Sequence, residues 1–133
     1  MTEPFVLAGF TMSTVSHGNF GMWRHPQDQT SRYTDLRYWV ELAQLLDAGG
    51  FDLLFIADAV GQLDVFGGSA EAALTGAVQT PVTDPLLAVS AMAAATDDVI
   101  MVVGGGQVYA QAIDRADRLE ITHLDREAPG DTV

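Results

Sequence analysis

The chain has 133 residues, a hydrophobic fraction of 48% and a formal net charge of −12, which together describe one acidic globular domain with its own core. Its negative charge excludes the basic surface that nucleic acids and anionic membranes require, and the absence of cysteine excludes disulfides and thiolate chemistry. All six basic residues are arginine, which also excludes lysine-based Schiff-base chemistry. With neither a membrane-length apolar run nor a signal-peptide pattern, we expect a cytoplasmic protein.

The first half of the sequence predicts two strands separated by a loop and a helix. Residues 5–11 form a short apolar run typical of a strand, and residues 12–32 are polar and contain glycine, which predicts a long loop. Thr34 is the expected N-cap of a helix, which the pair Gly49-Gly50 is expected to end. Residues 51–57 are apolar almost throughout, as is typical of a buried parallel strand.

The second half continues the alternation of helices and strands. Residues 60–83 are irregular, with a short helix expected near 69–74, and Asp84-Pro85 opens a further helix that runs to about residue 96. The remaining segments are a strand over 99–103, a helix over 104–114 and a strand over 119–124. The resulting β-α-β-α-β-α-β order predicts an α/β fold with a mostly parallel sheet.

Several separated motifs in residues 1–96 carry a family resemblance: Val6-Leu-Ala-Gly-Phe10, His17, Gly21-Met-Trp-Arg24, and the run from Phe51 to Asp58. They resemble the flavin-dependent monooxygenases of the nitrilotriacetate and dibenzothiophene-sulfone type, within the luciferase-like superfamily. The resemblance implies the start of a TIM barrel, with flavin mononucleotide (FMN) at the carboxyl ends of the strands. It also implies a small-molecule substrate and a flavin reductase partner that uses reduced nicotinamide. By this resemblance the FMN-binding residues are Phe10, His17, Phe55 and Asp58.

The residues themselves support this assignment only in part. We expect all four to lie at or just past the carboxyl ends of the predicted strands, where the functional rim of a parallel α/β sheet lies, and an aromatic ring can pack on the flavin. Yet a strand phenylalanine is usually a core residue, Asp58 suits a simple loop carboxylate, and His17 suits solvent. A TIM barrel needs eight β/α units and about 250 residues. The chain supplies two units and part of a third, so we expect millimolar flavin binding or none.

A glycine triplet, Gly104-Gly-Gly106, follows the predicted strand 99–103 and suits either a close approach of backbone amides to phosphate or a tight turn. It is no dinucleotide fingerprint, because Tyr109 stands where the third glycine would fall. With Asp117-Arg-Leu, Thr122-His and Gly130-Asp-Thr132, this stretch resembles dihydrofolate reductase. The resemblance implies NADPH contacts from Gly104, Gly105, Gly106, Gln107 and Val108, and pterin-side positions at Val103, Tyr109 and Thr122.

The two resemblances predict a chain of two segments, with residues 1–96 similar to the monooxygenases and residues 97–133 similar to the reductase. The expected fold is an incomplete TIM-barrel start joined to a reductase-like βαβ segment. The favoured function is a truncated FMN-dependent monooxygenase, inactive alone. The alternatives are a dihydrofolate reductase fragment, which reduces dihydrofolate with NADPH, and a non-enzymatic fusion or deletion product. Unpaired strand edges predict a homo-oligomer or aggregation. No catalytic residue and no metal site are assigned.

Overall fold

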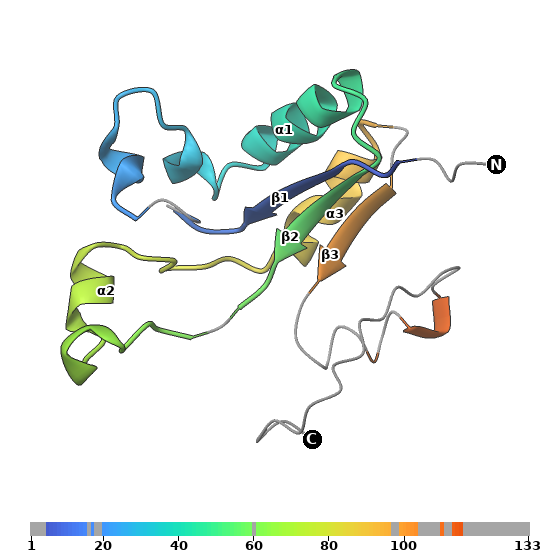
Figure 1. The fold of residues 1–133 in the computed structure, drawn as a ribbon. Helices are drawn as coiled ribbons and strands as arrows, with labels where there is room; N and C mark the ends of the chain where they lie inside the picture. The colour runs from blue at the N-terminus through green and yellow to red at the C-terminus, as the bar shows by residue number, and fades with distance from the viewer. Residues whose placement is uncertain are drawn as a thin grey trace.

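The computed structural model describes residues 5–15, 17, 20–59, 61–96, 99–103, 110 and 113–115; of 99–103 and 115 it describes the backbone alone. The described strands form a parallel three-stranded sheet in the order β1-β2-β3 (Figure 1). Their bounds are Ala8–Met12 for β1, Leu53–Ala57 for β2 and Val99–Val103 for β3. The predicted α/β class and parallel sheet are therefore present.

The sheet begins later than the sequence predicts. Residues 5–7 lie outside β1, and the backbone of Leu7 bonds to Asp52 in the turn that precedes β2. The Leu7 N–H donates to the Asp52 carboxylate at 2.8 Å, and the Asp52 N–H donates to the Leu7 carbonyl at 2.9 Å. These two bonds align the starts of β1 and β2, so that Phe10 pairs with Phe55 along the strands.

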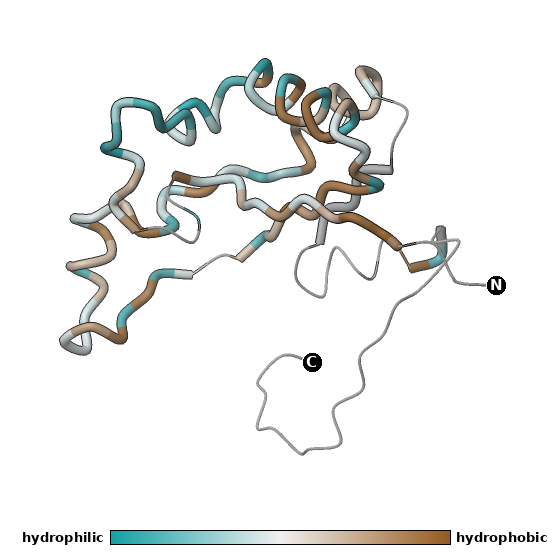
Figure 2. The backbone as a smooth tube through the Cα atoms, turned by 45° about the horizontal axis from the view of Figure 1, so that its top comes forward, coloured by the Kyte–Doolittle hydropathy of each residue, from teal (hydrophilic) through white to brown (hydrophobic). Residues whose placement is uncertain are grey.

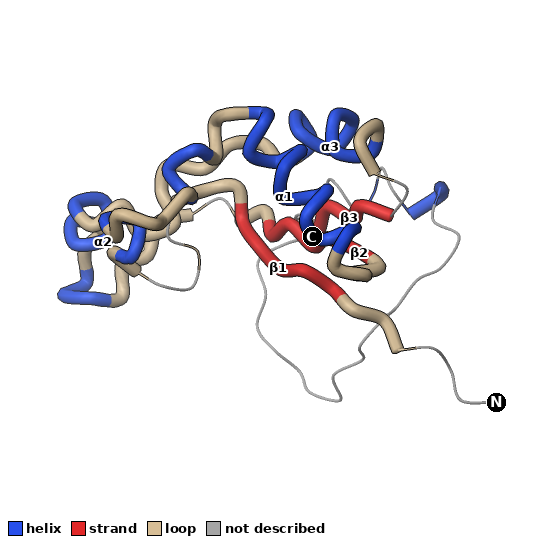
Figure 3. Tube along the Cα trace, turned by 90° about the horizontal axis from the view of Figure 1, so that it is seen from above, coloured by secondary structure: helices blue, strands red, loops and turns tan. Residues whose placement is uncertain are grey.

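Two helices, α1 (Leu36–Ala48) and α3 (Leu86–Ala93), connect the strands and pack on one face of the sheet (Figures 1 and 3). Parallel neighbours require such crossovers, because a tight turn cannot return the chain to the same end of the sheet. The core lies between these helices and β2, and consists of Trp39, Ala43, Leu54, Ile56, Ala88 and Met92. Brown hydrophobic stretches in Figure 2 gather where helices and sheet meet.

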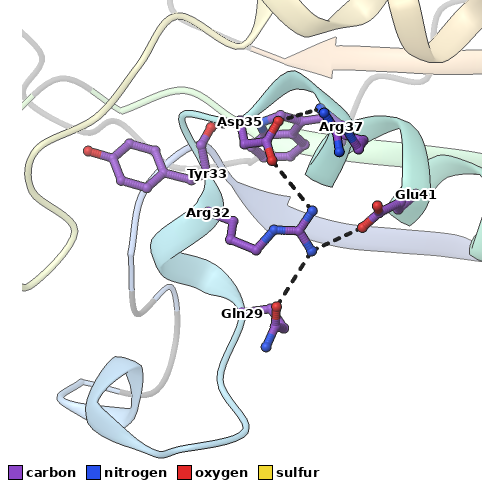
Figure 4. Close-up of polar contacts among 7 residues, drawn as sticks. Gln29, Arg32, Tyr33, Asp35, Arg37 and Glu41 are labelled. Atoms are coloured by element: carbon purple, nitrogen blue, oxygen red, sulfur yellow. Dashed lines mark hydrogen bonds and ion pairs between the residues drawn. The ribbon is translucent and has the colours of Figure 1, made fainter.

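The N-cap of α1 is Asp35, which corrects the prediction of Thr34. The Asp35 carboxylate accepts a hydrogen bond from the Arg37 backbone N–H at 3.0 Å, which satisfies one free donor of the first turn. Arg32 reaches both Asp35, at 3.5 Å, and Glu41, at 3.0 Å (Figure 4). The helix therefore starts one residue later than predicted.

At its other end α1 stops as predicted at the glycine pair. Gly49 is the C-cap, and Gly50 has φ +73°, a left-handed conformation that side chains disfavour.

A lobe of short helices extends beyond the carboxyl ends of the strands (Figure 1). It includes the 3₁₀ turns Met22–Arg24, Thr30–Arg32 and Phe66–Gly68, and the short helix α2 at Glu71–Thr75, close to the predicted 69–74. The Trp23 indole N–H donates to the Gly76 carbonyl at 3.0 Å and so joins the 3₁₀ turn Met22–Arg24 to the end of α2. The predicted loop 12–32 is therefore ordered in part by 3₁₀ turns.

Most of the predicted helix 104–114 and all of the predicted strand 119–124 lie outside the described residues. Of that region the structure describes Ala110 and a 3₁₀ turn at Ile113–Arg115. The reductase-like βαβ segment therefore stays a prediction. Among the described helices, none has the length and apolar character needed to cross a membrane.

Candidate functional site

Two aromatic residues stack on the sheet face opposite the helices. Phe10 of β1 and Phe55 of β2 are register partners, and their ring centroids lie 4.9 Å apart at an interplanar angle of 16°. Side chains alternate between the two faces of a strand, so Phe55 points away from the core face of Leu54 and Ile56. Phe10 is 59% exposed, which leaves an aromatic surface accessible.

His17 completes this group from the loop that follows β1. Its ring centroid lies 4.7 Å from that of Phe10 at 63°, an edge-to-face arrangement. The structure thus brings together three of the residues that the resemblance selected, Phe10, His17 and Phe55, which we call the aromatic cluster. The His17 imidazole carries ring nitrogen atoms that the two phenyl rings lack, so the cluster offers ring contacts and a hydrogen-bonding edge.

The fourth predicted flavin residue, Asp58, directly follows β2 and is partly buried. It therefore lies at the carboxyl end of β2, whereas Phe10 and Phe55 are the central residues of β1 and β2. None of the hydrogen bonds or ion pairs found among the described residues joins Asp58 to the cluster.

The loop between β1 and His17 carries two buried polar residues that the sequence analysis did not select. Ser13 and Thr14 are 3% and 2% exposed, and both contact the segment that precedes α3. Thr14 also forms an antiparallel bridge with Val82. No local pattern reveals these residues, because their partners lie 67 and 70 positions away in the sequence.

Of the predicted reductase-like positions, the structure describes Val103 alone. It ends β3, where its backbone pairs with Ala57 at the end of β2. The other positions lie outside the described residues: Gly104, Gly105, Gly106, Gln107, Val108, Tyr109 and Thr122.

The fold and sequence are similar to those of bacterial monooxygenases. The chain is 45% identical, over 127 residues, to the long-chain alkane monooxygenase of Geobacillus thermodenitrificans (strain NG80-2), and 48% identical over 127 residues to the dimethyl-sulfide monooxygenase of Hyphomicrobium sulfonivorans. The solved structure of the long-chain alkane monooxygenase matches with a TM-score of 0.72 at 50% identity, over 77% of this chain and 24% of that one. This chain is homologous to the luciferase-like flavin monooxygenases.

A further structural relative holds a flavin. A riboflavin lyase solved with modified FMN and riboflavin matches with a TM-score of 0.71 at 27% identity, over 84% of this chain and 26% of that one. The sequence matches to the two monooxygenases cover 95% of this chain, but only 29% and 26% of those relatives. The chain thus spans less than a third of their length.

A second similarity involves the C-terminal half. The family described as dihydrofolate reductase matches residues 70–133, and the type 3 dihydrofolate reductase of Salmonella typhimurium is 50% identical over 44 residues, 32% of this chain and 27% of that one. The monooxygenase matches extend past residue 96, and the reductase family match begins before residue 97. The division into 1–96 and 97–133 therefore stays a prediction.

Proposed function

We propose that this chain is a segment of an FMN-dependent monooxygenase, in which Phe10, His17 and Phe55 contact the flavin ring. The observation that carries the proposal is the aromatic cluster. Phe10 and Phe55 are the central residues of β1 and β2, and His17 packs on Phe10 from the loop that follows β1, on the side of the carboxyl ends of the strands, where this fold class binds its ligands. Homology to flavin monooxygenases supports the same cofactor. Reduced FMN, when bound, supplies the activation of dioxygen.

The aromatic cluster fits the ring system of FMN in its chemistry. Phenyl rings contact another aromatic system by stacking or edge-to-face packing, and the His17 imidazole adds a hydrogen-bonding edge. Asp58, at the end of β2, is proposed to accept a hydrogen bond from the ring or from the substrate. The FMN phosphate needs arginine, backbone amides or a helix N-terminus, and the net charge of −12 opposes its approach. We therefore assign the cluster to the flavin ring and not to the phosphate.

The remaining parts of the proposal follow from homology. A small molecule is the substrate, and a flavin reductase that uses reduced nicotinamide is the partner. The chain spans less than a third of the monooxygenases it matches, so we propose that it has no monooxygenase activity alone. We place it in the cytoplasm.

The second candidate is a dihydrofolate reductase fragment, which the family match over residues 70–133 favours. In this proposal Gly104, Gly105, Gly106, Gln107 and Val108 contact NADPH, whereas Val103, Tyr109 and Thr122 lie near the pterin. A fusion or deletion product without enzymatic activity is the third candidate, and similarity of one chain to two enzyme families favours it.

Flavin fluorescence tests the first candidate. Titration of the chain into FMN should quench its fluorescence with a dissociation constant of about 1 mM, because ring contacts alone give roughly 4 kcal/mol of binding free energy. Riboflavin, which lacks the phosphate, should be quenched equally. The double variant Phe10→Ala/Phe55→Ala should lose this quenching, whereas Phe66→Ala, at a residue that is 82% exposed in the lobe, should retain it.

Two results would contradict this assignment. Quenching that persists in the Phe10→Ala/Phe55→Ala variant would show that the aromatic cluster is not the flavin site. Micromolar FMN affinity with much weaker riboflavin binding would show that the chain holds the phosphate as well. Methotrexate and NADPH are added in parallel melting experiments, where we expect no rise in melting temperature; a clear rise would favour the reductase fragment.

A further inference from the structure

We propose that Ser13, Thr14 and Thr83 form a polar tether that holds the loop of His17 against the Phe10 ring. Thr14 is then a positioning residue of the aromatic cluster. The use of the tether in flavin binding rests on the proposed function, whereas the placement of His17 does not.

The tether consists of hydrogen bonds between the loop that follows β1 and residues 81–83. The Thr14 hydroxyl donates to the Pro81 carbonyl at 2.7 Å, and the Thr83 N–H donates to the Ser13 carbonyl at 2.9 Å. The hydroxyls of Ser13 and Thr83 bond to each other. The Thr14 N–H also donates to the Met12 carbonyl at 2.8 Å, which turns the chain directly after β1.

Burial makes these contacts specific. Ser13 and Thr14 are almost fully buried, and a buried hydroxyl that loses its hydrogen-bond partner destabilises the fold because water cannot replace that partner. The loop is therefore most stable in the position in which Ser13 and Thr14 bond to residues 81–83. Thr14 precedes His17 by three residues, so the fixed position of Thr14 restricts where the His17 imidazole can lie.

Residues 81–83, to which the loop is tethered, are themselves connected to the hydrophobic core through α3. Residues 81–83 lead into α3, and the Asp84 carboxylate accepts a hydrogen bond from the Leu86 N–H at 2.9 Å at the start of that helix. Helix α3 contributes Ala88 and Met92 to the core. The tether thus connects the His17 loop to the rigid part of the molecule, whereas Phe10 is positioned directly by β1.

Proton NMR of the full chain, without flavin, tests the tether. The His17 ring signals are identified by their absence from a His17→Gln variant, and their contact with Phe10 is measured as a nuclear Overhauser effect. Thr14→Val, which removes the hydroxyl at nearly constant volume, should lose this contact. Thr14→Ser should restore it, because serine keeps the hydroxyl that donates to Pro81.

The matched control is Thr96→Val. The Thr96 hydroxyl donates to the Met92 carbonyl at 3.1 Å, so this variant also removes a threonine bond to a backbone carbonyl, but away from the cluster. It should leave the His17 signals unchanged. A folded Thr14→Val protein that keeps the His17 contact would overturn the proposal. If Thr14→Val does not fold, Thr83→Val decides by the same readout. The two proposals can fail separately. If the unchanged chain does not quench FMN fluorescence but Thr14→Val loses the His17 contact, the flavin site is rejected and the tether is supported.

Discussion

Gly9 shows how one residue sets the distance between β1 and α1. A Cβ atom at this position would lie 2.9 Å from Cδ1 of Leu46 in α1 and 3.4 Å from Cδ1 of Leu54 in β2. The first distance is shorter than van der Waals contact allows, so any side chain at residue 9 must displace Leu46. The absence of a side chain at this position allows the helix to pack closely on the edge strand.

We predict that Gly9→Val lowers the free energy of unfolding by about 1–3 kcal/mol, the usual cost of overpacking. The control is Gly61→Val, because no atom lies within 4 Å of the corresponding Cβ position and φ there is not positive. Thermal or urea unfolding measures both. Equal stability of the two variants would contradict the packing argument, and partial recovery in Gly9→Val/Leu46→Ala would support it.

At the scale of the element, α1 depends on its capping network. The pKa of Asp35 is lowered, mainly by the hydrogen bond from the Arg37 backbone N–H. Desolvation is the next largest effect and opposes this shift, and the hydrogen bond and charge of Arg32 lower the pKa further. Hydrogen bonding to Glu41 in turn raises the pKa of Arg32. Both shifts favour the charged forms, so the network is strongest at neutral pH.

We predict that Asp35→Ala lowers the melting temperature at pH 7, because the first turn of α1 loses its cap. Since the folded-state pKa of Asp35 is lower than its unfolded value, its contribution is present above the usual carboxyl range and is lost as pH falls through the folded pKa. The difference between Asp35→Ala and the unchanged chain should therefore shrink at about pH 3.

The control is Asp64→Ala, which also removes one negative charge but at an exposed residue of the lobe. This variant should melt near the temperature of the unchanged chain at both pH values. An Asp35→Ala effect of constant size down to pH 3 would contradict the assignment of that stabilisation to the ionised carboxylate.

At the scale of the whole molecule, the described sheet is covered by helices α1 and α3 on one face (Figure 3). Parallel sheets are typically covered on both faces, because their strands are apolar on both. Here Phe10 is 59% exposed, and the residues just before β1 add apolar surface, with exposed fractions of 85% for Phe5, 55% for Val6 and 41% for Leu7. Strands β1 and β3 are the edges of the described sheet.

We predict that the isolated chain self-associates and that added salt strengthens the association. Apolar surface and free strand edges favour contact between copies, whereas a net charge of −12 opposes it until salt screens the repulsion. Light scattering after size exclusion, at about 0.02 M and about 0.5 M salt, measures this; the Debye length falls from tens of ångströms to a few across this range. A monodisperse monomer at both concentrations would contradict the prediction.

The sequence alone determined the elements that local chemistry specifies. Apolar runs predicted the three described strands, and the glycine pair predicted the end of α1. The family resemblance selected Phe10 and Phe55, which the structure places in contact at the middle of their strands and not at the strand ends. Their role toward flavin stays a prediction. The strands and the end of α1 were predictable because residue patterning and turn chemistry are properties of short stretches of the chain.

The tertiary structure decided what depends on contacts between distant segments. The tether pairs Thr14 with Pro81 and Ser13 with Thr83. The sequence around each of these residues is that of an ordinary polar loop, so it does not reveal the contacts. The N-cap of α1 is a local feature that the sequence left between two neighbouring residues: the Asp35 carboxylate, and not Thr34, accepts the hydrogen bond from the Arg37 N–H. Phe10 is 59% exposed because α1 and α3 both pack on the opposite face of the sheet, where they bury Leu54 and Ile56.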